Sequence, residues 1–551
     1  MKPVVTFVAA LLLLLMPAEI CRAGTDTNSL RVFIFAGQSN MVGSDSKAED
    51  IQRFPPFAGL DLPQDKILFS YSIGREEKLN SQGWVPLQPV DNVVGPELSF
   101  ARRVSQEIQA PIAIIKCAAG GTTLGGDWNP DEPSGFRLYP LALALVKSSL
   151  AELKRKGVPY RLEGFMWHQG ENDMFDKEFR PNYGRNLKSF LARWRRDLDA
   201  PELKFYIGEH VTKTIWGMDN RDNIDAIRAG QKSVTDSDPL AEYIPTSHVA
   251  VEIGGGAGLH YHYGTLGQLE HGVNYAEAYL RTIGMLKSKE RPLPAWPYAR
   301  GGPVRLFVLA GHRNMEGERA FTQELKSLEG HQALAIDNHR VAFKYRIGGG
   351  YKISNGWEPL GPAGFYDTFG PELSFGQTLL HEVPEGIAIA KFTHSGSQMN
   401  DWTPQGTNAK YRNLYPQFIA FIRESIQELR DKGQEVELAG IIYHVGENDM
   451  AYEPYRNRAT QWLRSTVEAS RRDLGMPTLR WYVSQQRLPE EGLGPNAVDV
   501  AAELAGIAAA DPDFVHVRAF DLPPGEEKLV ISSVGIVRLG ELLARSYLEH
   551  R

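Results

Sequence analysis

A serine in this chain stands where a nucleophile could be presented to an ester. Ser39 lies in the stretch RVFIFAGQSNMVG, on a glycine-flanked turn directly after an apolar run. A hydroxyl at the end of a buried strand is open to a base, and N–H groups at the start of the next helix can face an oxyanion. The pattern indicates acyl transfer, with capping of the next helix as the alternative role for Ser39.

Two other expected strand ends carry donors for a developing negative charge. Gly120 and Gly121 follow the apolar run IAIIKC and offer N–H groups without side-chain obstruction. Gln169, in the motif WHQGEND, adds a neutral amide donor. The same motif holds Glu171 and Asp173, for which hydrogen bonding within the loop is favoured over acid–base chemistry, because a second occurrence of the motif keeps both.

A base for Ser39 is expected in the stretch AGLHYHYGTLGQ. His260 and His262 are two residues apart and would share one face of an extended segment, while His271 follows in the next helical stretch. Imidazole titrates near neutrality and suits a general base. A metal site on His260 and His262 is the alternative, but the sequence nearby lacks the carboxylates or thiolates expected of zinc.

The stretch that carries Ser39 has a counterpart later in the chain. RLFVLAGHRNMEG matches it at an offset of 274 residues, and three further motifs recur at offsets of 275 or 276 residues. Near-constant offsets over this distance indicate duplication of a whole domain. The recurring motifs are GPELSF at 95–100 and 370–375, GENDM at 170–174 and 446–450, and RRDL at 195–198 and 471–474.

The chain divides into four expected parts. Residues 1–23 have the charged start, short apolar core and small flanking residues of a secretory signal peptide, which predicts a secreted or periplasmic protein. A Pro- and Gly-rich linker, 288–303, separates copy one (24–287) from copy two (304–551). Removal of the signal leaves Cys117 as the one remaining cysteine, and we expect it to be a buried thiol at the end of a strand.

Each copy alternates strand-length apolar runs with amphipathic helical stretches. This alternation predicts two tandem three-layer α/β/α domains with mainly parallel central sheets. Sites in such sheets lie beyond the carboxyl ends of the strands, where GQSN, GGTT and HQGEND all fall. A net charge of −7 without a Lys/Arg run argues against nucleic acid as a partner, and no second segment is apolar enough for a membrane span. The sequence leaves the oligomeric state open.

These motifs together resemble the SGNH hydrolases, specifically the carbohydrate acetylesterase branch with a SASA-type domain that includes sialate O-acetylesterases and acetylxylan esterases. The resemblance implies flavodoxin-like domains, an O-acetylated carbohydrate as substrate, and neither a metal nor an organic cofactor. Carried over residue by residue, it makes Ser39 the nucleophile and a late histidine the base. The oxyanion hole would use the N–H of Ser39, Gly120 or Gly121, and Gln169, while Asn40, Glu171 and Asp173 would anchor the loops.

One departure from the family pattern concerns the acid that orients the histidine. The family usually has an aspartate three residues before it, whereas this chain has Ala257 and Leu259 at the two possible positions. The spacing to the following Gly-Gln favours His262 over His260 as the base. The site is then a Ser–His dyad or takes its acid from elsewhere, with Glu252 as a candidate.

Copy two lacks the expected nucleophile, base and side-chain oxyanion donor, but it keeps the recurring motifs. Arg313 stands for Ser39, and the position matching His262 is about Val530. We therefore expect copy two to be a pseudo-esterase domain, which either packs against copy one or binds glycan in a vestigial pocket. The expected function is a secreted serine esterase that removes O-acetyl groups from carbohydrates. The alternative is a non-catalytic glycan-binding protein built from two dead domains. The other replacements are His312 for Gln38, Ser395 for Gly120 and Val445 for Gln169.

Overall fold

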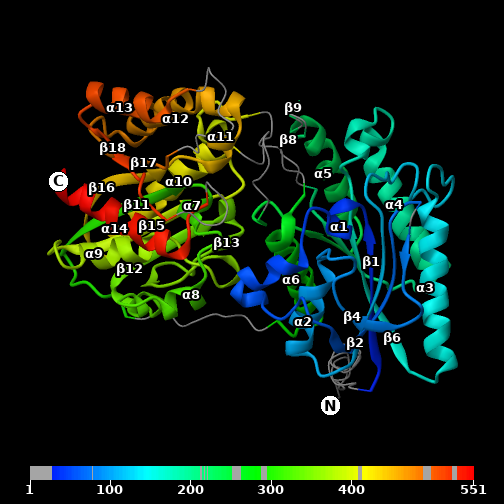
Figure 1. Ribbon diagram of the computed structural model, residues 1–551. Helices are drawn as coiled ribbons and strands as arrows, with labels where there is room; N and C mark the ends of the chain where they lie inside the picture. The colour runs from blue at the N-terminus through cyan, green and yellow to red at the C-terminus, as the bar shows by residue number, and fades with distance from the viewer. Residues whose placement is uncertain are drawn as a thin grey trace, which may run out of the picture.

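The computed structural model shows two α/β lobes, with copy one in blue to green and copy two in green to red (Figure 1). The predicted signal peptide and the candidates His260 and Glu252 lie outside the described residues. Among the described residues, no helix combines the length and the hydrophobicity that crossing a membrane requires. The structure describes residues 28–76, 78–210, 214–215, 218–219, 221–250, 262–286, 295–407, 413–487, 498–523 and 530–551.

Copy one is built on an eight-stranded sheet in the order β10-β7-β6-β1-β5-β2-β3, with β4 paired to β2. The strands from β10 to β2 run parallel, and only β3 and β4 are antiparallel. The strands are β1 (Leu30–Gly37), β2 (Gln64–Ile73), β3 (Leu79–Asn80), β4 (Val85–Leu87), β5 (Ile112–Ala118), β6 (Tyr160–His168), β7 (Phe205–Gly208) and β10 (Ala241–Ile244), besides a small ribbon of β8 (Thr214–Ile215) and β9 (Met218–Asp219). The helices are α1 (Ser39–Val42), α2 (Glu97–Glu107), α3 (Leu138–Arg155), α4 (Phe179–Asp197), α5 (Arg221–Thr235) and α6 (Gly264–Thr282).

Copy two repeats this topology, in the order β13-β12-β15-β11-β16-β17-β18 with β14 paired to β12. The predicted tandem of mainly parallel α/β domains is thus confirmed. Its strands are β11 (Pro303–Gly311), β12 (Asn338–Ile347), β13 (Lys352–Ile353), β14 (Glu358–Leu360), β15 (Gly386–Thr393), β16 (Glu435–His444), β17 (Trp481–Gln485) and β18 (Phe514–Arg518). Its helices are α7 (Arg313–Glu316), α8 (Thr322–Ser327), α9 (Glu372–Leu379), α10 (Leu414–Asp431), α11 (Glu447–Ala451), α12 (Glu453–Leu474), α13 (Val500–Ala510) and α14 (Ser533–Glu549).

The central strands are apolar on both faces because helices cover both. In β1, Phe33 and Phe35 pack with residues of α2 and α6, while Val32 and Ile34 pack with residues of α3 and α4. Successive side chains of a strand point to opposite faces, so a strand buried on both sides reads as a continuous apolar run. Cys117 on β5 is buried as expected, and burial raises the pKa of its thiol to about 12.

The recurring motifs mark shared scaffold contacts. Glu97 of GPELSF forms a buried ion pair with Lys116 on β5, with 2.8 Å between the carboxylate and Nζ. Glu372 and Lys391 repeat this pair at 2.8 Å in copy two. Breaking a buried pair by removing one partner typically costs about 3–5 kcal/mol, which is a physical reason for both copies to keep the motif.

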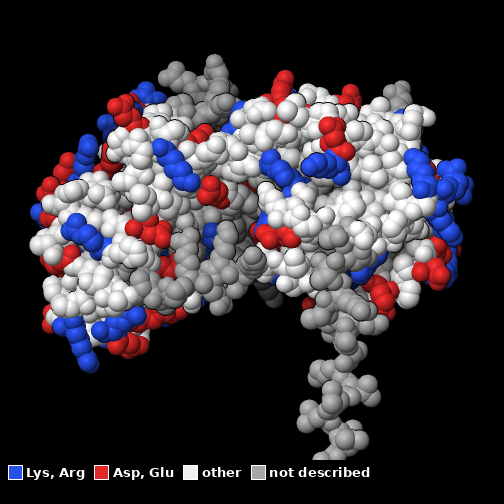
Figure 2. All heavy atoms as spheres, turned by 90° about the horizontal axis from the view of Figure 1, so that it is seen from below, with Lys and Arg blue, Asp and Glu red and all other residues white. Residues whose placement is uncertain are grey.

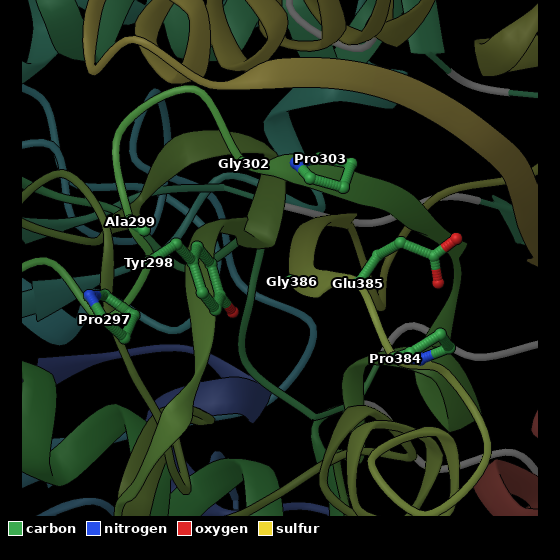
Figure 3. A pocket seen from close by; sticks show the side chains of 8 residues that line it. All are labelled: Pro297, Tyr298, Ala299, Gly302, Pro303, Pro384, Glu385 and Gly386. Carbon is green, nitrogen blue, oxygen red and sulfur yellow. The ribbon is translucent and has the colours of Figure 1, made fainter.

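The linker is attached to copy two at the edge of the sheet where the strands begin. The hydroxyl of Tyr298 accepts hydrogen bonds from the N–H groups of Ala342 and Ile387, at 3.2 and 3.1 Å. A pocket of about 490 Å³ opens beside this tyrosine, lined by Glu385 and the start of β11 (Figure 3). Because it lies at the amino edge of the sheet, this pocket is remote from the strand ends at which the sequence predicts chemistry.

Candidate active site

The register of the sheet brings three motifs of copy one together. Gly37, the last residue of β1, pairs with Ala118 on β5 and with His168 on β6. Ser39, Gly120 and Gln169 each follow one of these strands within two residues, so they meet at the carboxyl edge. Gly37 has φ 152°, and a Cβ on it would lie 2.0 Å from the carbonyl oxygen of His168. Only glycine allows β1 to turn into α1 at this point.

Ser39 is the first residue of α1 and does not cap it, because Gln38 occupies the N-cap. The serine is 8% exposed. A Cβ on Gly120 would lie 3.5 Å from the Cβ of Ser39, so the glycine pair borders the serine side chain directly. Among the described residues, the N–H groups of Ser39, Gly120 and Gly121 have no acceptor, which leaves them available to an oxyanion.

Gln169 lies at this edge, but its amide serves the loops. Its Nε2 donates to Oε1 of Gln38 at 3.0 Å, to the carbonyl oxygen of Thr122 at 3.0 Å and to Oδ2 of Asp173 at 2.5 Å. An amide has two N–H groups, so three acceptors occupy both. In this geometry the Gln169 amide joins three loop segments, and neither of its N–H groups is left for an oxyanion.

Asn172 is a further amide at the site, which the sequence analysis did not single out. Its Oδ1 accepts from Nε2 of Gln38 at 3.1 Å, which leaves the Nδ2 donors for the pocket. The matching Asn448 of copy two accepts from Nε of Arg313 at 3.2 Å and donates to the carbonyl oxygen of Ser395 at 3.2 Å. This amide therefore lies between the positions of Ser39 and Gly120, where an oxyanion donor is required.

The loop-anchoring residues hold these elements in place. Nδ2 of Asn40 donates to Oε1 of Glu171 at 2.6 Å. The carboxylate of Asp173 accepts from the N–H groups of Leu124 and Gly125, at 2.8 and 2.9 Å. Burial raises the pKa of Glu171 to about 7 and that of Asp173 to about 6.

His262 lies next to the nucleophile turn. The N–H of Tyr263 donates to Oδ1 of Asn40 at 3.2 Å, which ties the residue after the histidine to the residue after Ser39. Nδ1 of His262 is 2.6 Å from Oδ2 of Asp45, a residue of the turn that follows α1. His271 lies elsewhere, fully buried in α6, with its Nε2 3.2 Å from Nδ1 of His168. Burial holds the pKa of His271 well below its ordinary value, so His271 is neutral.

Copy two closes the matching position. Arg313, at the place of Ser39, is 2% exposed, and its guanidinium donates to Glu318 at 2.9 Å. Its backbone N–H donates to the carboxylate of Glu447 at 3.1 Å, so the N–H that is open in copy one is occupied. Oδ1 of Asn314 accepts from the N–H of Ile531 at 2.8 Å, as Asn40 does from Tyr263. Val530 therefore stands at the place of His262, as the sequence predicts.

Comparison with known proteins agrees with this duplicated site. The family model described as carbohydrate esterase, sialic acid-specific acetylesterase, matches residues 29–281 and again residues 303–549. The chain belongs to this family of carbohydrate esterases. The resemblance inferred from the motifs is thereby confirmed.

Individual relatives of this esterase are distant. A probable carbohydrate esterase of Arabidopsis thaliana is 28% identical over 185 residues, which cover 31% of this chain and 66% of the relative. Among solved structures, an Arabidopsis protein is 22% identical with a TM-score of 0.35, covering 46% of this chain and 98% of that one. The crystal structure of NanS matches at 15% identity and a TM-score of 0.36, over 46% and 98% of the two chains. A carbohydrate acetylesterase from Xanthomonas citri matches at 18% and 0.34, over 44% and 55%.

The degenerate esterase copy packs on copy one with the rim of its own former site. Phe321 joins the core of copy one, with its ring centroid 6.2 Å from that of Phe54. The ring of Phe365 stacks on His248 at 4.4 Å, and the hydroxyl of Tyr366 donates to Asn274 at 2.6 Å. These contacts all come from segments beside the carboxyl edge of the second sheet. Copy one therefore packs beside the edge where copy two would take a ligand.

Buried carboxylates meet at this junction between the two esterase copies. Glu270 of α6 accepts from the N–H of Ala250 at 2.6 Å. Burial, together with the negative charge of Glu318, raises the pKa of Glu270 well above its ordinary value. Burial likewise raises the pKa of Glu316 to about 7, with Glu318 adding to the shift. Burial in this region therefore favours the protonated forms of Glu270 and Glu316.

Proposed function

We propose that copy one is a serine esterase that removes O-acetyl groups from carbohydrates. The observation that supports it best is the set of differences between the copies. The serine, the glycine beside it and the histidine meet at one edge of copy one, and each is replaced at the matching edge of copy two. Copy two keeps the scaffold residues and folds without the serine, the glycine and the histidine, so these three residues are not needed for folding.

The proposed reaction proceeds through an acyl-enzyme. Oγ of Ser39 attacks the acetyl carbonyl carbon while His262 accepts the hydroxyl proton. The N–H groups of Ser39, Gly120 and Gly121, with the Nδ2 amide of Asn172, hold the tetrahedral oxyanion. Its collapse breaks the bond to the sugar oxygen, which takes the proton from His262. Water then attacks the acetyl-serine by the same route and releases acetate.

Among acetylated sugars, we propose one that carries a carboxylate, such as an O-acetylated sialic acid, over neutral acetylxylan. Arg75 follows β2 at the same edge, and a Cβ on Gly121 would lie 3.2 Å from its guanidinium NH1. Its guanidinium rests on the ring of Phe136 at 5.1 Å and is exposed, with no carboxylate paired to it among the described residues. Arginine suits bidentate recognition of a carboxylate. Copy two has Gly349 at this position, so Arg75 is lost along with the chemical residues.

The proposal is tested by acetate release from O-acetylated sialic acid, acetylxylan and simple acetylated sugars. We expect Ser39→Ala to abolish release and covalent labelling by a fluorophosphonate. Arg75→Gln should raise KM for the acidic substrate roughly 10-fold, the equivalent of one charged hydrogen bond, and leave the neutral substrates unchanged. Arg155→Gln, at the far end of α3, is the matched control. Release that is indifferent to Ser39 would exclude the esterase, and absence of both release and labelling would favour the glycan-binding alternative.

Export of the protein is part of the proposal and rests on the anatomy of residues 1–23. Expression with the full leader in a secreting host should yield a mature chain that begins at Gly24. Amino-terminal sequencing reads this directly, and an intact leader on the accumulated protein would contradict it.

A further inference from the structure

The imidazole of His262 has a carboxylate partner that the family pattern does not supply. Nδ1 of His262 and Oδ2 of Asp45 are 2.6 Å apart, a hydrogen bond between the histidine and the turn after the nucleophile helix. The side chain of His262 is 10% exposed and that of Asp45 is 68% exposed. The carboxylate thus approaches the ring from the solvent side. We propose that Asp45 is the residue that orients His262 for catalysis, an inference that rests on the proposed esterase function.

Asp45 is held in position by the residues on both sides of it. Gly43 and Ser44 donate their N–H groups to the carbonyl oxygen of Ser39, at 2.9 and 3.0 Å. Oγ of Ser46 accepts from the N–H of Val94 at 2.8 Å. Asp45 itself has φ 63°, a left-handed conformation that aspartate tolerates better than most residues. The turn therefore has one defined geometry, and it begins at the nucleophile.

Two hydrogen bonds fix the histidine relative to this turn. On one side, Asn40 accepts from the N–H of Tyr263 at 3.2 Å. On the other, the N–H of Lys47 donates to Oγ1 of Thr265, in the first turn of α6, at 2.8 Å. His262 and Asp45 lie between these two clamps, so the backbone itself brings the carboxylate to the imidazole.

The contact determines which ring nitrogen acts as the base. A carboxylate only accepts hydrogen bonds, so the proton of the neutral imidazole is placed on Nδ1 and the lone pair on Nε2. A carboxylate in this place also stabilises the imidazolium formed when the serine proton is taken up. Asp45 would thus do from the nucleophile turn what the aspartate of the histidine loop does in relatives. It acts through His262 and is a positioning residue.

The copies support the assignment independently of the distance. Arg319 of copy two stands at the position of Asp45, where Val530 has replaced His262. Its guanidinium lies over the ring of Phe54 at 5.8 Å, in the junction with copy one. A positive charge there could not orient an imidazole. The carboxylate has thus been lost together with the histidine that it contacts.

Steady-state kinetics of Asp45→Asn over pH 5 to 9 test the proposal. We expect kcat to fall roughly 10²-fold with little change in KM, less than the ~10⁴-fold loss typical of a buried triad aspartate, because Asp45 is largely exposed. Asp45→Glu, which keeps the carboxylate, should recover part of kcat, whereas a change of fold alone would not be rescued by the conservative variant.

The matched control is Asp199→Asn. Asp199 has φ 52°, a similar backbone conformation, and lies between α4 and β7 at the opposite edge of the sheet. It should leave both kcat and KM unchanged. If Asp45→Asn retains kcat within about threefold while Ser39→Ala is inactive, the role of Asp45 is wrong and the esterase stands. If wild type itself shows no Ser39-dependent release, the proposed function has failed instead.

Discussion

The two copies place different groups at the same edge of the same sheet. In copy one, the N–H of Ser39 has no acceptor among the described residues, whereas the N–H of Arg313 in copy two donates to Glu447. The glutamates Glu171 and Glu447 are shared, and burial raises the pKa of each to about 7. A common scaffold thus leaves this backbone N–H open in one copy and pairs it with a buried carboxylate in the other.

The surface of the two lobes and the junction between them also differ in composition. Figure 2 shows acidic and basic side chains interspersed over both lobes on the face that it presents, with no extended patch of one sign. The junction between the lobes instead combines the aromatic rings of Phe321 and Phe365 with the buried carboxylate of Glu270. Loss of chemistry in copy two is therefore accompanied by use of its rim for packing.

The most direct test of the difference between the copies returns residues of copy one to copy two. In a Ser39→Ala background, Arg313→Ser with Glu318→Ser places the residues of copy one at both positions and removes the ion pair whole. We expect no acetate release, because Val530 supplies no base and copy one packs beside the edge. The same two changes with Ser39 intact are the control for folding and should retain wild-type activity. Recovery of fluorophosphonate labelling at position 313 would contradict the comparison.

The oxyanion donors offer a second, smaller test. Asn172→Ala should lower kcat by about 10²-fold or more, the usual loss of one oxyanion donor, with little change in thermal stability. Gln169→Ala should lower both kcat and the melting temperature, because its amide joins three loop segments. Asn448→Ala is the matched control in copy two and should leave kcat unchanged. Equal loss of kcat in Asn172→Ala and Asn448→Ala would show that the amide acts on the fold alone.

The smallest expected effect concerns pH and the junction. Glu316 of copy two has its pKa raised from 4.5 to about 7, mainly by burial, so the folded state holds a proton that the unfolded state releases. Its contribution to stability is complete below the unfolded pKa and is lost as pH rises through about 7. We expect the melting temperature of copy two to fall between pH 5 and 8, and to fall less in Glu316→Gln.

Copy one provides the control for this measurement. Val42 stands at the position of Glu316 and does not titrate. Val42→Leu should therefore leave the pH dependence of the melting temperature as in wild type. An equally steep fall in Glu316→Gln would assign the pH dependence to other buried carboxylates.

Much of the candidate site at the carboxyl edge of the sheet was predictable, because the strand ends and the spacing of the repeated motifs can be read from the sequence. The apolar runs locate β1, β5 and β6, and the parallel register then gathers Ser39, Gly120 and Gln169. The direction of the Gln169 amide was not predictable, because it depends on side-chain partners 47 and 131 residues away. Asn172 gave no signal, since copy two keeps it as Asn448.

The roles of Asp45 and of the junction are reflected in differences between the two copies that lie outside the recurring motifs. The histidine pattern directs attention to the residues just before His262, whereas the carboxylate comes from the turn after Ser39. Comparison of the copies at that turn gives Asp45 against Arg319, and Lys47 against Phe321. The first change reverses a charge and the second makes a rim residue apolar. Both changes lie in the sequence just outside the recurring motif.

The covered rim of copy two has a consequence for the history of the chain. A hydrolase has to leave the mouth of its pocket open, so natural selection forbids adhesive residues there for as long as the enzyme works. Phe321 and Tyr366 of copy two bind the neighbouring domain at this rim. A serine restored at position 313 would therefore meet a rim that is already engaged in packing, and regaining a second active site would require this contact to loosen.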